Sequence, residues 1–210
     1  MSVLTLKNIN KKFRGKVIFS NFNLEVKDMD FVAITGKSGA GKTTLLNMMG
    51  LIEEPDSGLL EFDGKKAGKP NSREATKVIR ENIGYLFQNF ALLENETVKK
   101  NLLVALRYVK ISSKEKEEKI REVLEEVSLS GFENRKIYEL SGGEQQRVAI
   151  ARVMLKPSTV VLADEPTGSL DDFNRDVVVS LLRKLNETRA VVVVTHDMSV
   201  AKVASKIVEI

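Results

Sequence analysis

One segment constrains the fold more than any other, because an apolar run, a glycine-rich loop and helical spacing follow one another directly. The apolar run is FVAIT at residues 31–35, and the loop is GKSGAGKT at residues 36–43. Leu45, Leu46 and Met49 then recur at helical spacing. The loop fits the pattern G-x-x-x-x-G-K-[ST], which cradles phosphate when it lies between a strand and a helix. The segment therefore predicts an α/β protein that binds a triphosphate.

Each residue type in this loop meets a need of phosphate binding. The glycines allow the backbone to curl so that its N–H groups converge on an anion, and the helix N-terminus adds free N–H groups and a positive dipole end. Lys42 is placed to reach the β- and γ-phosphates, and the Thr43 hydroxyl is placed to ligate Mg²⁺. The alternative is a glycine-rich turn with a chance lysine. The predicted nucleotide-binding residues are Gly36, Lys37, Ser38, Gly39, Ala40, Gly41, Lys42, Thr43 and Thr44.

A second apolar run, VVLADE at residues 160–165, ends in two carboxylates. Ligands of open α/β sheets bind at the carboxyl ends of the strands. Asp164 is suited to hold Mg²⁺ through its water shell, and Glu165 then lies where a water attacks the γ-phosphorus. We expect Glu165 to act as the general base or to position that water. The alternative is a pair of solvated carboxylates in a turn before Pro166.

The rest of the chain alternates apolar strands with helices, which predicts a parallel sheet covered on both faces. Residues 1–35 show period-2 patterning typical of strands. From residue 89 to residue 156 the pattern is helical, and Ser112 with Glu115 forms a capping-box pair that opens a charged helix. Further strands are expected at residues 58–64, 83–87, 160–163 and 191–194, and helices at residues 72–81 and 143–155.

The charge, the cysteine count and the length of the apolar runs exclude several classes of function. The net charge is +4, from 33 basic and 29 acidic residues that are interleaved along the chain, so no basic patch for nucleic acid is expected. The chain has no cysteine, which excludes disulfides, thiolate metal sites and a thiol nucleophile. No run approaches the ~18 to 20 apolar residues of a membrane span.

The segment LSGGEQQR at residues 140–147, together with the phosphate loop, VVLADE and the single His196, resembles the nucleotide-binding subunit of ABC transporters. The resemblance covers essentially the whole chain in the expected order. It implies a P-loop NTPase (RecA-like) α/β core with a mostly parallel sheet, an N-terminal antiparallel β subdomain and an inserted α-helical subdomain. The implied single domain spans 1–210, with a catalytic core at 1–88 and 158–210 and a helical subdomain at 89–157.

The resemblance also implies roles for single residues. Phe13 corresponds to the aromatic that stacks on adenine, although an ordinary core residue is the alternative. Gln88 corresponds to the glutamine that contacts Mg²⁺ and the attacking water. His196 corresponds to the switch histidine that contacts the γ-phosphate, and it directly follows the strand expected at residues 191–195. The implied catalytic set is therefore Glu165, His196 and Gln88, and the implied metal set is Thr43, Gln88 and Asp164.

The motif itself is consistent with phosphate binding, because glycines that open a helix leave N–H groups and a dipole end exposed. In the family, this loop completes the ATP site of a second copy, so that two ATP molecules are enclosed in a head-to-tail dimer with two-fold symmetry. The segment Ser169-Leu170-Asp171 corresponds to the loop that crosses the dimer interface. The implied residues on this side of the site are Ser141, Gly142, Gly143, Glu144 and Asp171.

The function implied by the resemblance is ATP hydrolysis, with ATP and Mg²⁺, coupled to transport by an integral membrane permease. The chain is then peripheral on the cytoplasmic face of the membrane, and the permease docks near Gln88 and residues 89–107. Apolar Phe90, Leu92 and Leu93 belong either to that dock or to the core. The segments ELSGGEQQRVAIAR and ADEPTGSLD are similar to the corresponding segments in subunits of macrolide efflux, lipoprotein release, bacteriocin export and cell-division complexes. This similarity leaves the cargo open. Two alternatives are an ABC-type ATPase of DNA repair or translation and a regulatory module without turnover.

Overall fold

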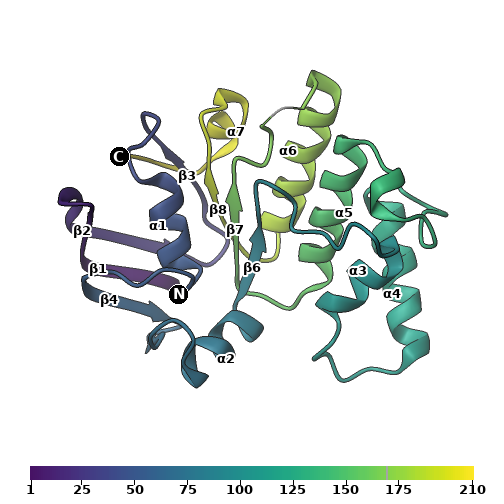
Figure 1. Ribbon diagram of the computed structural model, residues 1–210, viewed down its shortest axis with the longest axis horizontal. Helices are drawn as coiled ribbons and strands as arrows, with labels where there is room; N and C mark the ends of the chain where they lie inside the picture. Colours follow the sequence, from purple (N-terminus) through teal and green to yellow (C-terminus); the bar gives the residue numbers. More distant parts are fainter. Residues whose placement is uncertain (169) are drawn as a thin grey trace.

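The computed structural model describes residues 1–168 and 170–210, and it contains two β-sheets with helices between and beside them (Figure 1). The first sheet is antiparallel, and the second is parallel. The three helices of the insertion lie on the far side of the parallel sheet from the antiparallel sheet (Figure 1). This is the α/β architecture expected from the sequence.

The antiparallel sheet has the strand order β2-β1-β4-β5. Its first hairpin turns at Arg14 and Gly15, which both have positive φ angles, as the tight turn of a hairpin requires. In β1, Leu4 and Leu6 are buried and Thr5 between them is partly exposed, as the expected period-2 pattern requires. The strands are β1 (Ser2–Phe13), β2 (Lys16–Lys27), β4 (Ser57–Phe62) and β5 (Lys65–Lys66).

The parallel sheet has the strand order β6-β7-β8-β3-β9. Its register brings Ala33 of β3 level with Val193 of β8, and Val193 level with Ala163 of β7. Because all these strands run in the same direction, their carboxyl ends form one edge of the sheet. The strands are β3 (Phe31–Thr35), β6 (Ile83–Leu86), β7 (Val160–Asp164), β8 (Ala190–Val194) and β9 (Lys206–Glu209).

Two hydrophobic cores cover the two faces of the parallel sheet. Along β8, Val192 and Val194 face a core shared with α1 and the antiparallel sheet. Val191 and Val193 face a core shared with α5 and α6. This explains why the central strands are apolar at every position: both faces are buried. The helices are α1 (Lys42–Met49), α2 (Arg73–Glu81), α3 (Val98–Ala105), α4 (Ser113–Glu126), α5 (Gly142–Leu155), α6 (Asp172–Asn186) and α7 (Met198–Val203).

The expected elements are present, and five further strands and helices were not predicted individually. The capping box of Ser112 and Glu115 opens α4, with the Ser112 N–H donating to Glu115 at 2.7 Å. The sequence patterns did not identify α3, α6, α7, β5 or β9. In β9 the reason is physical, because its outward-facing residues are exposed and give no continuous apolar run.

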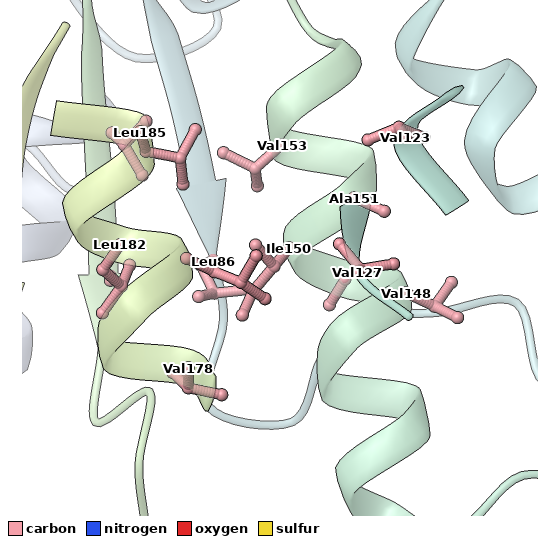
Figure 2. Close-up of a cluster of buried hydrophobic side chains, with 14 of the residues drawn as sticks. Leu86, Val123, Val127, Val148, Ile150, Ala151, Val153, Val178, Leu182 and Leu185 are labelled. Carbon is pink, nitrogen blue, oxygen red and sulfur yellow. The ribbon is translucent and has the colours of Figure 1, made fainter. Parts of the chain in front are cut away.

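Ile150 of α5 lies at the centre of the second core. Figure 2 shows its side chain directed toward Leu86 of β6, between α5 and α6. Val178 and Leu182 of α6 approach from one side, and Val127 lies on the other side of α5 (Figure 2). Ile150 therefore joins the helical insertion to the sheet.

We expect Ile150→Ala to lower the free energy of unfolding by about 2–5 kcal/mol, because the truncation leaves a cavity between α5 and the sheet. Urea denaturation followed by circular dichroism measures this change. The matched control is Ile52→Ala, which truncates the same residue type at an exposed position and is expected to change stability by less than about 0.5 kcal/mol. Equal effects of the two substitutions would contradict the central role of Ile150.

Candidate functional site

The phosphate loop connects β3 to α1. Gly36, Gly39 and Gly41 have φ angles of 147°, 75° and 101°, which side chains other than glycine rarely adopt. Gly36 lies against the carbonyl of Ile210 and Gly41 against the side chain of Ile18, so a Cβ atom fits at neither position. Gly41 is also the N-cap of α1 and offers no side-chain cap to the helix. The first N–H groups of α1 are therefore available to an anion.

Lys42 and Thr43 begin α1 and extend toward the loop and β7. The Lys42 ammonium donates to the carbonyl oxygens of Gly36 and Lys37, at 2.9 and 3.0 Å. The Thr43 hydroxyl donates to Asp164 Oδ1 at 3.4 Å. These contacts place a cationic group inside the loop and a hydroxyl group beside a carboxylate.

Asp164 ends β7 and is buried. Burial raises the pKa of its carboxyl group, the Thr43 hydrogen bond opposes this shift, and the neighbouring Glu165 adds to it. A cation at this position would favour the ionised form. The Thr43 hydroxyl and the Asp164 carboxylate are hard oxygen ligands of the kind that Mg²⁺ prefers. No cluster of three or more metal-binding His, Cys, Asp or Glu residues occurs in the described residues.

Glu165 and His196 lie side by side at the same edge of the sheet. His196 Nδ1 lies 2.9 Å from Glu165 Oε2, and the His196 backbone N–H donates to the same oxygen at 3.3 Å. Glu165 has a φ of 44°, a strained conformation for a residue with a Cβ atom. Its backbone N–H donates to the carbonyl of Val194, which fixes it against β8. The Glu165 carboxylate is therefore held in one place, whereas 75% of the His196 side chain is exposed.

A polar cluster around Asp197 supports this pair, and the sequence analysis missed it. Asp197 Oδ2 accepts from the Thr167 hydroxyl at 2.9 Å and lies 3.3 Å from Arg175 Nε. Burial favours the neutral acid, but hydrogen bonds from Ser199 and Thr167 outweigh it and hold the pKa of Asp197 below its usual value. Because Thr167 follows Glu165 and Asp197 follows His196, the cluster ties the two loops together. The sequence signal was a polar Thr167 in an otherwise acidic and apolar segment.

The start of α5 carries the motif LSGGEQQR. Ser141 is the N-cap, and its hydroxyl donates to Glu144 Oε2 at 2.8 Å, while the Ser141 N–H donates to the same oxygen at 2.7 Å. The backbone and side-chain hydrogen bonds from Ser141 lower the pKa of Glu144. Ser141 and Gly142 are exposed. In a single chain, the Ser141 hydroxyl is therefore already engaged by Glu144 rather than free.

Two side chains further along α5 hold segments of the sheet edge, and neither was predicted from the sequence. Gln146 is buried and donates to the carbonyl of Pro166 at 2.8 Å, directly after Glu165. Arg152 donates to the carbonyls of Phe90 and Ala91 at 2.7 and 2.6 Å, just after Gln88. The available signal for Gln146 was its position, four residues before Ile150 on the buried face of the helix.

Phe13 and Gln88 lie at two further places around the site. Phe13 ends β1 and is 59% exposed, so it is not a core residue. Its hairpin packs against the phosphate loop through Ile18 and Gly41. Gln88 is exposed and follows β6, whose Leu86 is paired with Ala163 of β7. Gln88 therefore follows a strand that ends at the same sheet edge as Asp164.

The residues predicted on the loops after Gln88 and Glu165 differ in their exposure and contacts. Phe90 and Leu92 are partly buried against the helical core, whereas Leu93 is 52% exposed. Asp171 is the N-cap of α6 and accepts from the Asn174 N–H at 2.8 Å. Ser169 lies outside the described residues.

The glycine loop, the lysine and threonine that follow it, and the two carboxylates at the neighbouring strand end define a nucleoside triphosphatase of the P-loop class. Comparison with protein families makes the identification more specific. The family model for ABC transporters matches residues 19–168. The chain belongs to the ABC transporter family and carries its ATP-hydrolysing cassette.

Curated relatives point to the same family. The chain is 39% identical to the macrolide export ATP-binding/permease protein MacB of Campylobacter jejuni over 99% of its own length, and 37% identical to the MacB protein of Neisseria gonorrhoeae over its full length. It spans 33% of the length of each of these relatives. Within the described part of this chain, no helix has the length and apolarity needed to cross a membrane.

Solved structures agree with the observed fold. The ATP-binding cassette MJ0796, determined as a dimer in a post-hydrolysis state with ADP and phosphate, superimposes with a TM-score of 0.89 at 37% identity, covering 99% of this chain and 94% of that one. The cbiO1 subunit of Clostridium perfringens, part of the ABC transporter complex cbiONQ, gives a TM-score of 0.83 at 26% identity, covering 95% of this chain and 80% of that one.

The raised pKa of Asp164 leads to a test by stability. A buried acid whose pKa is raised stabilises the fold at low pH, and this stability is lost as the pH rises through its folded-state pKa. We therefore expect nucleotide-free Asp164→Asn to melt at a higher temperature than the wild type at pH 7, with the difference shrinking as the pH falls toward about 4. Scanning calorimetry at several pH values measures this. Asp28→Asn removes an exposed carboxylate and serves as the control. A lower melting temperature of Asp164→Asn at pH 7 would contradict the assignment.

Proposed function

We propose that this chain hydrolyses ATP at the carboxyl edge of its parallel sheet and couples hydrolysis to a membrane permease. One observation carries the proposal: Lys42, Thr43, Asp164, Glu165 and His196 come from three separate segments and meet at that edge. No structural requirement of the fold asks for a lysine, a buried acid and a strained glutamate in one place. A catalytic site accounts for all three.

In this proposal, the phosphate loop binds the triphosphate and Phe13 stacks on adenine. The loop residues from Gly36 to Thr44 supply backbone N–H groups, and the Lys42 ammonium exchanges its loop carbonyls for phosphate oxygens. The exposed ring of Phe13 supports stacking, because a ring with a free face is available to a base. Arg14 Cζ lies 5.5 Å from the centroid of the same ring and adds positive charge beside it.

Thr43, Asp164 and Gln88 would hold Mg²⁺, which supplies neutralising charge for the phosphate oxygens. Thr43 and Asp164 are in contact through a hydrogen bond, and Gln88 follows the neighbouring strand. A cation held there would favour the ionised form of Asp164, because it would offset the desolvation of the carboxylate.

Glu165 orients the attacking water and accepts its proton, while the water oxygen forms a bond to the γ-phosphorus. The bond from the γ-phosphorus to the ADP oxygen breaks, and its electron pair leaves with ADP. His196 contacts the γ-phosphate and holds the Glu165 carboxylate through the 2.9 Å contact. The strained backbone of Glu165 is consistent with a catalytic role, because strain is tolerated where the direction of the side chain is important for function.

The loop at the start of α5 completes the site of a second copy. Ser141, Gly142, Gly143 and Glu144 lie at an outward-facing helix N-terminus, and Asp171 caps the neighbouring α6. Support comes from MJ0796, which was determined as a dimer. The active unit is then a head-to-tail pair of chains that encloses two ATP molecules.

A membrane permease is the proposed partner, and residues 89–157 form the helical subdomain that faces it. Leu93, Val104 and Tyr108 expose apolar surface on this part of the chain. The relatives named macrolide export ATP-binding/permease protein favour an export function, with a drug, peptide or lipoprotein-like cargo. The chain would then lie on the cytoplasmic face of the membrane as a peripheral subunit.

We expect Glu165→Gln to retain ATP binding, to lower kcat by at least about 100-fold because the water loses its base, and to accumulate as an ATP-bound dimer. Gel filtration with light scattering in Mg²⁺ and ATP measures the dimer, and phosphate release measures kcat. A variant that elutes only as a monomer with saturating ATP would argue against the shared site.

We expect Lys42→Ala to weaken ATP binding by about 10- to 150-fold, because it removes a charge-assisted hydrogen bond to phosphate. Fluorescence titration with a labelled nucleotide measures the Kd. The control is Lys114→Ala, which removes an exposed lysine from α4 and is expected to leave the Kd unchanged. Unchanged binding by Lys42→Ala would mean that the loop does not hold the phosphates.

A further inference from the structure

Asn174 of α6 contacts both loops that the proposed function assigns to the second copy. Its side-chain Nδ2 donates to Asp171 Oδ2 at 2.8 Å. Its Oδ1 accepts from Arg147 Nη1, also at 2.8 Å. Arg147 is the last residue of LSGGEQQR, so one amide group bridges the start of α5 and the cap of α6.

Gly143 also lies directly against this amide. A Cβ atom at Gly143 would stand 2.5 Å from Asn174 Oδ1 and 2.7 Å from its Cγ, closer than side-chain atoms pack. The absence of a side chain at Gly143 therefore lets α5 approach Asn174. Arg147 Nε is buried and has no hydrogen-bond partner among the described residues. Within the described chain, the Arg147 guanidinium hydrogen-bonds to Asn174 through Nη1.

We propose that Asn174 is a positioning residue that holds the signature loop, Ser141 to Glu144, and the Asp171 loop as one unit. Both loops then meet the ATP of the second copy in a fixed relative position. This inference rests on the proposed function, because it concerns the half of the site that each chain offers to its partner.

The link would lower the entropy cost of closing the dimer. Two independent loops each lose freedom when they are ordered against a ligand, whereas two loops that are already linked lose less. The carboxylate of Asp171 is also kept pointing at Asn174 by two hydrogen bonds, one from the backbone and one from the side chain. The link therefore pre-organises the surface before ATP arrives.

The simpler explanation is that Asn174 only stabilises the first turn of α6. The two explanations separate in Asn174→Ala, because the backbone N–H of residue 174 still donates to Asp171 and the helix cap remains. Only the link to Arg147 and the side-chain bond to Asp171 are lost. A matched control is Asn186→Ala on the same helix, which removes an amide that donates to the carbonyls of Met29 and Arg189.

The experiment uses the 210-residue chain with Glu165→Gln, the variant that is expected to accumulate as an ATP-bound dimer. We expect adding Asn174→Ala to raise the ATP concentration for half-maximal dimer formation by about 2- to 30-fold. We expect the Kd of the dilute monomer for ADP to stay unchanged. Asn186→Ala in the same background is expected to change neither quantity. Light scattering measures the dimer, and a labelled ADP measures the monomer.

Other outcomes overturn the inference in distinct ways. If Asn174→Ala leaves dimer formation unchanged, or weakens monomer binding by the same factor, the residue does not act on the shared half of the site. An equal effect of Asn186→Ala would assign the change to the stability of α6.

Asn174→Asp keeps the acceptor for Arg147 but sets a carboxylate against Asp171, and it is expected to impair dimer formation at least as much as Asn174→Ala. If Glu165→Gln itself never dimerises, the proposed function fails and this inference falls with it.

Discussion

The register of the parallel sheet is the constraint on which the site depends. Because β3, β7 and β8 are level with one another, the loops that follow them begin at the same height on the carboxyl edge. The loop after β3 carries the glycines and leads to Lys42, β7 ends at Asp164 and is followed by Glu165, and the loop after β8 carries His196. A shift of one residue in any strand would turn its side chains to the opposite core. The apolar faces that set the register therefore also set the catalytic geometry.

Helix α5 extends this order to the helical insertion. Its N-terminal turn exposes Ser141 and Gly142, Gln146 holds the turn after Glu165, and Arg152 holds the turn after Gln88. Ile150 packs between these two polar links. Because one rigid helix contacts both turns, a rotation of the insertion would move them together. This gives the proposed permease contact a physical route to the proposed ATP site.

The sequence predicted the parts whose chemistry is local. A glycine loop between a strand and a helix, carboxylates at a strand end and a capping box all follow from neighbouring residues, and each is present. The contacts that join distant segments were not predictable: Gln146 reaches Pro166, Thr167 reaches Asp197, and Asn174 reaches Arg147. Each joins two segments that are distant in the sequence, so no single stretch encodes it. The engagement of Ser141 by Glu144 was missed for a different reason, because the motif was interpreted only as a phosphate receptor.

That engagement bears on why a dimer of this kind would need ATP. In the single chain, two hydrogen-bond donors at the N-terminus of α5 already have a partner, because Glu144 accepts from both the Ser141 N–H and the Ser141 hydroxyl. A phosphate from a second copy would have to take the hydroxyl from a carboxylate and approach its negative charge. Only a ligand that brings compensating contacts, from the N–H groups of Gly142 and Gly143 and from its own phosphate loop, would meet that cost. In the proposed dimer, the capping box therefore sets a cost that phosphate binding at Ser141 must offset, while the link through Asn174 would hold the same surface in place for that binding.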